Sequence, residues 1–309
     1  MNTERYIQAA TRENTRIAYQ ASIEHFESHW GGFLPATADS VARYLAHYAE
    51  SLSINTLRQR LAALAAWHKE QGFPDPTKAP HVKKVLKGIT ALHPHTEKKA
   101  KPLCIEGLNT VITTIDQQLA VTDNKAEEYR LTRNKALFLL GFWRAFRSDE
   151  LSRINIENVE VFPGKGMAIF LSRSKSDRNH QGNTYRAPAL QSLCPVSAYL
   201  DWIHLAKLES GPLFRGINRW GRIAKTPLNP ASIIGIIRSS CQLAGLTDSS
   251  LFSSHSLRRG FASWANDQQW DIKNLMNYVG WKDVQSAMRY IDQPDPFSQQ
   301  AIENGLQRS

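Results

Sequence analysis

Near the end of the sequence, an indole and a phenol occur at a spacing that suits phosphoryl transfer. Trp281 follows Gly280, and Tyr290 lies nine residues further on. Gly280 can end one helix and Asp283 can begin the next, which puts Tyr290 about two turns along it. The Trp281 N–H is a donor that does not titrate, and the Tyr290 oxygen can attack phosphorus. Taken alone, two aromatic residues in this pattern are more often part of a packed core.

A second segment places a histidine and an arginine at the start of a predicted helix. His255 and Arg258 are three residues apart, so they share one face of a helix that begins near residue 254 or 256. The unpaired N–H groups and the positive dipole end at a helix N-terminus add to these side chains and favour a bound phosphate. The alternative is a solvated helix start without a ligand.

A third segment, residues 141–151, is an apolar helix that opens into a polar turn. Arg147 lies just past the apolar run. Glu150, three residues later, can hold the Arg147 guanidinium at the angle that a phosphate needs. An ordinary salt bridge at a helix end is the alternative explanation.

The charge of the chain is compatible with a polyanionic partner. The 309 residues include 38 Lys and Arg against 28 Asp and Glu, a formal net charge of +10. Basic proteins of this size often bind nucleic acid, but a charge spread evenly over the surface forms no groove. Charge alone therefore leaves nucleic-acid binding and a merely basic surface as alternatives.

The sequence also excludes several classes of protein. The three cysteines are far apart and in no C-x-x-C spacing, so we expect reduced thiols rather than a disulfide framework or a zinc site. No apolar run approaches the roughly 20 residues that cross a bilayer. No basic stretch followed by an apolar one begins the chain, so we expect no secretory signal and a cytoplasmic protein.

The elements that must position these residues form two predicted domains. In residues 1–92, helical patterns run through residues 11–30, 41–51, 54–71 and 82–89. Thr37 or Asp39 can cap the second helix, Ser53 precedes the third, the fourth should start after Pro76, and glycines end the first and the third. Residues 93–102 are polar, basic and bounded by proline, which predicts a linker.

The second predicted domain, residues 103–309, changes period along its length. Helical patterns at 105–119 and 127–142 precede three strand patterns at 159–162, 167–171 and 184–189. A basic loop, residues 172–183, joins the last two strands. Further helices are predicted at 195–208, 229–244, 256–267, 271–279 and 284–290. A mainly helical domain with a small sheet results.

In their order along the chain, these residues resemble the signature of the tyrosine recombinases, also called phage integrases. That signature is Arg-x-x-Glu, a lysine in a β-hairpin loop, His-x-x-Arg, a histidine or tryptophan, and a nucleophilic tyrosine. The matching residues here are Arg147, Glu150, Lys175, His255, Arg258, Trp281 and Tyr290. Trp281, where many relatives have histidine, resembles the Cre-like members. One departure is Ser254, where the family usually has glycine, and it puts the geometry of the helix entry in question.

The resemblance spans nearly the whole chain and implies a fold. We expect a mainly α protein with a helical N-terminal core-binding domain and a mixed α+β catalytic domain that contains a small antiparallel sheet. The core-binding domain would contact DNA. Its third helix, with Arg58, Gln59 and Arg60, is the expected base-reading element, and basic residues elsewhere suit phosphate contacts. These phosphate-binding candidates are Lys83, Lys84, Lys87, Lys98, Lys99, Lys101 and Arg173.

The resemblance also implies a mechanism. Arg147 and Arg258 would bind the nonbridging oxygens of the scissile phosphate. His255 and Trp281 would add hydrogen bonds, and Tyr290 would form a 3′-phosphotyrosyl bond. That bond conserves the energy needed for religation, so no cofactor and no metal is expected.

Three further roles follow from the resemblance. Lys175 would protonate the leaving 5′-oxygen, with Arg173 as the substitute if the register differs by two residues. Glu150 would hold the arginine or histidine in position without contacting the substrate. Residues 297–306 would form a short helix that docks on a neighbouring protomer, with a frayed tail as the alternative.

The implied partner is double-stranded DNA that carries an inverted-repeat target site. Four protomers would exchange strands in pairs through a Holliday junction, and the free protein would be a monomer or weak oligomer without a membrane partner. We expect a DNA-associated protein of bacterial, phage or mobile-element origin. A type IB topoisomerase, which relaxes DNA with related residues, is one alternative. A DNA-binding relative without catalysis is another, although it would be expected to lack at least one site residue.

Overall fold

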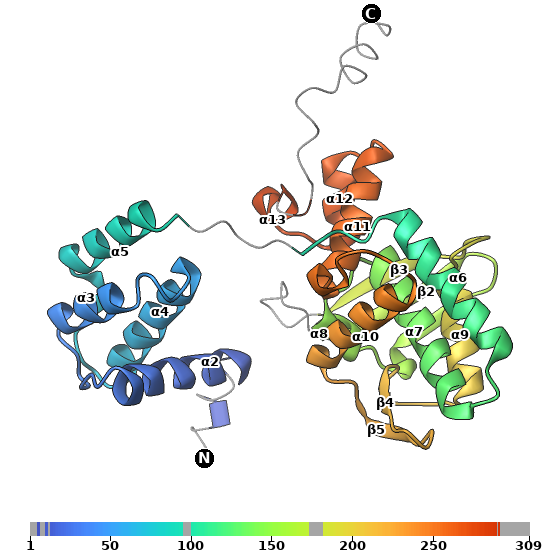
Figure 1. Cartoon of the computed structure of the whole chain (residues 1–309), viewed down its shortest axis with the longest axis horizontal. Helices are drawn as coiled ribbons and strands as arrows, with labels where there is room; N and C mark the ends of the chain where they lie inside the picture. Colours follow the sequence, from blue (N-terminus) through green and yellow to red (C-terminus); the bar gives the residue numbers. More distant parts are fainter. Residues whose placement is uncertain are drawn as a thin grey trace, which may run out of the picture. The chain divides into compact units, whose positions relative to one another are not determined.

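The computed structural model describes residues 5–6, 10–11, 13–94, 100–172, 182–288 and 290. The chain forms two compact units, Met1–Lys98 and Lys99–Ser309, both drawn in Figure 1. The division falls inside the segment 93–102 that the sequence predicts to be a linker. The predicted fold class, mainly helical with a small antiparallel sheet, is confirmed.

In the part of the N-terminal unit that the structure describes, four α-helices have defined bounds and locally encoded ends. They are α2 (Glu13–Glu24), α3 (Ala38–His47), α4 (Ile54–Glu70) and α5 (Pro80–Leu92), with a π-helical turn at His25–His29 and a 3₁₀ turn at Pro76–Lys78. The hydroxyl of Thr37 accepts a hydrogen bond from the Ser40 N–H, and that of Ser53 accepts one from Thr56. Both are N-caps, which is why α3 and α4 begin where the sequence predicts. α2 packs on α4, and α3 packs on α5.

The C-terminal unit contains the remaining helices and two small sheets. Its helices are α6 (Ile105–Val121), α7 (Lys125–Trp143), α8 (Ser148–Ser152), α9 (Pro195–Leu205), α10 (Pro230–Leu243), α11 (Ser254–Asp267), α12 (Ile272–Val279) and α13 (Val284–Met288). Helix α7 lies at the centre, where it packs against α6, α9 and α11. Its residues from Ala136 to Phe142 are all buried, as expected for a helix that is apolar on all sides.

The main sheet has three antiparallel strands in the order β1–β2–β3. They are β1 (Val159–Phe162), β2 (Gly166–Leu171) and β3 (Asn183–Pro188). Alternate residues of β2, namely Met167, Ile169 and Leu171, are buried, and Ile169 faces Tyr185 of β3. This alternation is typical of a sheet with one covered face. β3 is an edge strand, as predicted.

A second, two-stranded sheet was not predicted from the sequence. It is the antiparallel pair β4 (Arg215–Ile217) and β5 (Ile223–Pro227). Its turn is held against α7, because Arg130 Nη2 donates a hydrogen bond to the Asn218 carbonyl at 2.8 Å. Arg219 and Trp220 at the turn are exposed.

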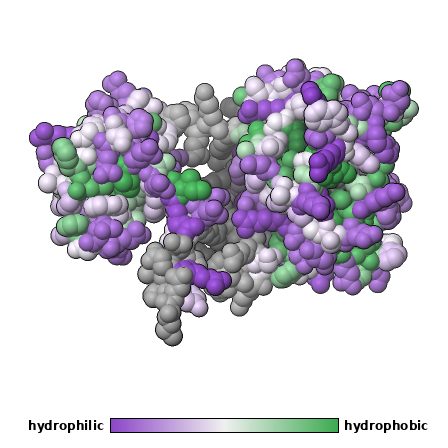
Figure 2. Space-filling view, turned by 90° about the horizontal axis from the view of Figure 1, so that it is seen from below, coloured by the Kyte–Doolittle hydropathy of each residue, from purple (hydrophilic) through white to green (hydrophobic). Residues whose placement is uncertain are grey.

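Figure 2 shows one face of the molecule, on which each unit is mostly hydrophilic and carries scattered hydrophobic patches. Within the described ranges, no helix has the length and apolar character that a bilayer crossing needs. The same residues contain no group of three His, Cys, Asp or Glu side chains placed to hold a metal ion. All three cysteines are free thiols.

A close backbone approach joins the start of the C-terminal unit to α11. The Leu103 N–H donates to the Ser256 carbonyl at 3.0 Å. One turn later, a Cβ on Gly260 would lie 1.8 Å from the Leu103 carbonyl oxygen. Only glycine therefore allows this contact without moving backbone.

We predict that Gly260→Ala destabilises the C-terminal unit, because its methyl group would overlap a backbone atom. The free energy of unfolding should fall by about 1–3 kcal/mol or more. The matched control is Gly235→Ala in α10, where nothing lies within 4 Å of the added Cβ. That change should stabilise by up to about 1 kcal/mol, because alanine favours helix. Urea denaturation measures both, and equal stability of the two variants would contradict the prediction.

Candidate active site

The turn between α7 and α8 places Arg147 and Glu150. The Arg147 N–H donates to Glu150 Oε2 at 2.8 Å, and Arg147 Nη1 donates to Oε1 at 2.7 Å. The side chain of Glu150 is 3% exposed and that of Arg147 is 20% exposed. One carboxylate thus fixes both the backbone and the guanidinium of Arg147. The ion pair that the sequence predicted is present. It differs from an ordinary surface pair because its carboxylate partner, Glu150, is buried.

Arg258 reaches the same carboxylate from helix α11. Its side chain is 1% exposed, and Nη1 lies 3.9 Å from Glu150 Oε2. Nη1 also donates to the Ala145 carbonyl at 2.6 Å. Ala145 has a φ of 50°, in the left-handed region, and this conformation occurs in the turn that presents its carbonyl to Arg258. Burial, together with the nearby charge of Arg147, lowers the pKa of Arg258 to about 10, so the guanidinium stays charged at neutral pH.

His255 lies at the start of α11, where the helix entry is ordered despite the serine at 254. The Ser253 hydroxyl accepts a hydrogen bond from the His255 N–H at 3.1 Å. In return, the Ser256 hydroxyl accepts one from the Ser253 N–H at 2.9 Å, which completes a capping box. The helix therefore begins at Ser254. His255 and Arg258 follow on one face, as their spacing predicts.

Tyr290 lies beside His255. Its hydroxyl is 3.2 Å from His255 Nδ1, and which atom donates depends on the histidine tautomer. The Tyr290 N–H donates to the Ala287 carbonyl at 2.9 Å, so the residue sits in the turn that follows α13. The hydrogen bond between the Tyr290 hydroxyl and His255 joins residues that are 35 positions apart in the sequence.

Trp281 forms one wall of the cluster. Its ring stacks on that of Tyr290, with 5.4 Å between centroids and an angle of 25°. The Arg258 Cζ lies 5.1 Å from the Trp281 ring and 5.3 Å from the Tyr290 ring, within cation–π range. Gly280, with a φ of 79°, ends α12, and the backbone N–H of Trp281 donates to the Met276 carbonyl at 2.9 Å. This glycine C-cap turns the chain so that the indole meets the cluster.

Several buried donors of this cluster have no protein acceptor among the described residues. They are Nε and Nη2 of Arg258 and Nε1 of Trp281. A buried N–H without a partner costs about 1–3 kcal/mol, and more when it belongs to a charged group. Donors from two side chains at one place suit an acceptor with several oxygens, such as a phosphate.

Two predicted site residues cannot be placed. Lys175 and Arg173 lie outside the described residues, as do Lys98, Lys99 and residues 297–306. The described strands β2 and β3 flank the segment that carries Lys175. The structure therefore brings together six of the seven residues that match the signature and leaves the seventh unplaced.

The predicted DNA-contacting residues of the N-terminal unit differ in exposure. On α4, Arg58 and Gln59 are exposed, and so are the three α5 lysines Lys83, Lys84 and Lys87. Arg60 is half-buried, and its Nη1 donates to the Tyr44 hydroxyl at 3.1 Å. Arg60 is thus engaged inside its own unit, which sets it apart from Arg58 and Gln59. In the C-terminal unit, Lys101 pairs with Asp248 at 3.1 Å.

Sequence reasoning missed two buried residues that touch the cluster. Tyr185 of β3 packs on Phe146 with 5.1 Å between ring centroids, and lies against Gly280. Arg144, at the end of α7, is only 3% exposed. The available signal for Arg144 was its position between Trp143 and Phe146, because an arginine inside an apolar run must find buried acceptors.

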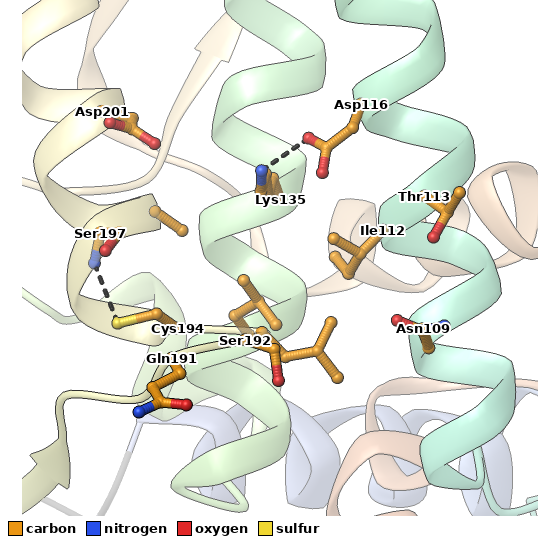
Figure 3. Close-up of a pocket in the computed structure, with 13 residues that line it drawn as sticks. Asn109, Ile112, Thr113, Asp116, Lys135, Gln191, Ser192, Cys194, Ser197 and Asp201 are labelled. Atoms are coloured by element: carbon orange, nitrogen blue, oxygen red, sulfur yellow. Dashed lines mark hydrogen bonds and ion pairs between the residues drawn. The ribbon is translucent and has the colours of Figure 1, made fainter.

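A surface cavity of about 300 Å³ lies between α6, α7 and the start of α9, and none of the signature residues lines it. Figure 3 shows its two interactions, an ion pair of 2.6 Å between Asp116 and Lys135 and a hydrogen bond from the Ser197 N–H to Cys194. Burial alone would raise the pKa of Cys194, but hydrogen bonds from Ser197 and neighbouring N–H groups outweigh it and lower that pKa. Asp116 and Lys135, and likewise Ser197 and Cys194, are thus engaged with each other within the cavity wall.

Comparison with known proteins gives consistent matches. The model of the phage integrase family matches residues 113–295. An integrase/recombinase XerD homologue of Selenomonas ruminantium is 30% identical and covers 98% of this chain and 88% of its own. The recombinase Cre of Escherichia phage P1 is 25% identical, with 84% and 77% covered. The expected likeness to Cre is thus present, but weaker than the likeness to the XerD homologue.

The fold also matches solved structures. A post-cleavage complex of the XerH site-specific recombinase, bound to a palindromic difH substrate, superposes with a TM-score of 0.64. It is 19% identical and covers 94% of this chain and 78% of the other. At this identity, the match supports the fold.

We predict that Glu150→Gln strongly destabilises the protein, because Glu150 is the one carboxylate among the described residues that pairs with both Arg147 and Arg258. The free energy of unfolding should fall by about 3 kcal/mol. The neighbouring change Asp149→Asn is the control, because Asp149 pairs with Arg153 at the surface, where their side chains are 37% and 47% exposed. It should cost less than about 1 kcal/mol. Thermal and urea unfolding measure both, and equal losses would refute the assignment.

Proposed function

Because the chain belongs to the phage integrase family, the tyrosine-type site-specific recombinases that break and rejoin DNA, we propose that Tyr290 is its nucleophile and that the surrounding cluster is its active site. The observation that carries the proposal is the contact of 3.2 Å between the Tyr290 hydroxyl and His255 Nδ1. Together with the distance of 5.3 Å between Arg258 Cζ and the Tyr290 ring, and with Glu150 joining Arg147 to Arg258, it supports a site in which a phenol, an imidazole and two guanidinium groups act on one phosphate.

Arg147 and Arg258 hold the scissile phosphate by its nonbridging oxygens. Negative charge grows on these oxygens as the phenol attacks, and guanidinium groups fixed in advance stabilise it at little reorganisation cost. The unpaired donors of Arg258 and the indole N–H of Trp281 provide further bonds to the same oxygens. Glu150 holds the two arginines in place without contacting the substrate.

The covalent step conserves atoms and charge within the site. His255, in the tautomer with an unprotonated Nδ1, accepts the phenolic proton while Tyr290 Oη bonds to phosphorus. The bond from phosphorus to the 5′-oxygen breaks, and that oxygen takes a proton from Lys175, or from Arg173 if the register differs. A 3′-phosphotyrosyl link remains. Attack by a 5′-hydroxyl reverses the sequence and rejoins the strand.

The N-terminal unit contributes the DNA contacts outside the active site. Arg58 and Gln59 on α4 are the candidates for reading bases, and Lys83, Lys84 and Lys87 on α5 contact phosphates. All five are exposed, which supports this assignment. We propose a target with inverted repeats, on which four protomers assemble and exchange strands through a Holliday junction. The XerH complex with a palindromic substrate is consistent with such a site.

We predict that Tyr290→Phe abolishes covalent capture of DNA and leaves DNA binding intact, because only the nucleophilic oxygen is lost. Sheared DNA from around the gene is incubated with the protein, denatured and run on a gel, and the DNA in the adduct is sequenced. Adduct ends should define an inverted repeat around a short spacer. Arg147→Ala and Arg258→Ala should slow adduct formation by about 100-fold or more.

The control for this experiment is Tyr129→Phe, which removes a hydroxyl from a tyrosine of α7 whose ring packs on Trp202 of α9, and it should leave capture unchanged. An adduct formed by Tyr290→Phe would refute the assignment of the nucleophile. Capture without any recombinant joint between two target sites would indicate a DNA-relaxing enzyme instead.

We predict that replacing the α5 lysines by glutamine weakens DNA binding and its salt dependence. Each lysine that contacts a phosphate should lower the slope of log affinity against log salt by about 0.9. Lys125→Gln is the control, because Lys125 is already paired with Glu128 at 2.7 Å. Gel-shift titrations at several salt concentrations measure the slopes. Identical slopes for Lys84→Gln and Lys125→Gln would argue against the α5 contact.

A further inference from the structure

Arg144 is a buried charge whose described partners are two backbone carbonyls and two aromatic rings. It follows the last residue of α7 and precedes Arg147 by three residues. Burial of a charged group carries a desolvation cost, and an apolar side chain of similar size often serves stability equally well. The bonds that Arg144 makes therefore need a reason beyond packing.

One end of the Arg144 guanidinium holds the edge strand β3. Nη1 donates to the Arg186 carbonyl at 3.0 Å, and Cζ lies 5.3 Å from the ring of Tyr185. The chain enters β3 directly from the segment that carries Lys175. The position of β3 thus sets where that segment is anchored.

The other end of the guanidinium holds the end of α12. Nη2 donates to the Tyr278 carbonyl, and the ring of Tyr278 lies 3.9 Å from Cζ. The last carbonyls of a helix have no partner within it, and a cation there is favourable. Gly280 and Trp281 follow at once, so this bond fixes the start of the segment that leads to Tyr290.

We propose that Arg144 is a positioning residue that sets the strand leading from the Lys175 segment against the helix leading to Trp281 and Tyr290. This proposal rests on the proposed function. The planar guanidinium can bond to two carbonyls in two directions at once, whereas the ammonium of lysine is a single point at the end of a flexible chain. One side chain therefore aligns β3 with the end of α12, although it is not itself a member of the catalytic cluster.

The first test compares two leaving groups in Arg144→Lys. One substrate is the target duplex identified by adduct capture, and the other is the same duplex with sulfur in place of the bridging 5′-oxygen. A thiolate leaves without protonation, so the sulfur substrate does not need the proton donor. We expect adduct formation on the oxygen substrate to slow by about 100-fold. The defect should be at least about tenfold smaller on the sulfur substrate.

The matched control is Arg133→Lys, which changes another buried arginine of α7. Arg133 is 5% exposed and its Nη1 donates to the Arg215 carbonyl of β4 at 3.0 Å. Its loss should lower the melting temperature to a similar extent without changing the ratio between the two substrates. An equal defect on both substrates for Arg144→Lys, or no defect on either, would overturn the proposal.

A second test requires no DNA and is independent of the proposed function. Amide hydrogen exchange should be faster in Arg144→Lys than in the wild type, both in β3 and in the last turn of α12. In Arg133→Lys neither segment should change. If exchange in both segments is unaltered by Arg144→Lys, the bridge does not hold them and the proposal fails. If the wild type captures no DNA, the catalytic proposal fails while this measurement still decides the role of the bridge.

Discussion

One buried carboxylate between two guanidinium groups is the interaction on which the site depends. Arg147 and Arg258 carry like charges beside the same carboxylate and would repel each other. Burial, and then the charge of Arg147, lower the pKa of Arg258. Glu150 offsets this repulsion while leaving the trio with one net positive charge. That residual charge matches the single negative charge of a phosphodiester. Under the proposed function, a bound phosphodiester would therefore neutralise the excess charge of these three side chains.

The fold brings these groups together because the helices that carry them begin or end next to the cluster. The turn after α7 supplies Arg147, the start of α11 supplies His255 and Arg258, and the glycine after α12 supplies Trp281. Arg147 and Trp281 lie just beyond a helix end, where backbone geometry departs from the helix, and His255 and Arg258 lie in the first two turns of α11. Tyr290 follows α13 and lies in a turn, where its backbone N–H donates to the Ala287 carbonyl.

Much of this architecture was predictable from local chemistry. Ser53, Thr37 and Gly280 mark helix boundaries through interactions with residues a few positions away, so their effects are readable in the sequence. The same holds for β2, whose alternating apolar residues predict one buried face. The order of the signature residues, compared with a known family, predicted which side chains would converge.

The features that were missed depend on distant partners. Arg144 bonds to residues 42 and 134 positions away, and no local pattern encodes such a pairing. Strands β4 and β5 have three and five residues, and they lack the alternation that identifies a strand. The sequence also could not show that Arg60, unlike Arg58, is held by Tyr44. In each case tertiary packing decides what local propensity leaves open.

The contact between Leu103 and helix α11 limits where the connection between the two units can vary. Because the Leu103 backbone is locked to Ser256 and pressed against Gly260, residue 103 already belongs to the rigid body that carries His255 and Arg258. Chimeras that exchange N-terminal units between relatives should therefore be spliced upstream of residue 100. A junction placed after residue 103 would replace a structural part of the C-terminal unit along with the N-terminal unit.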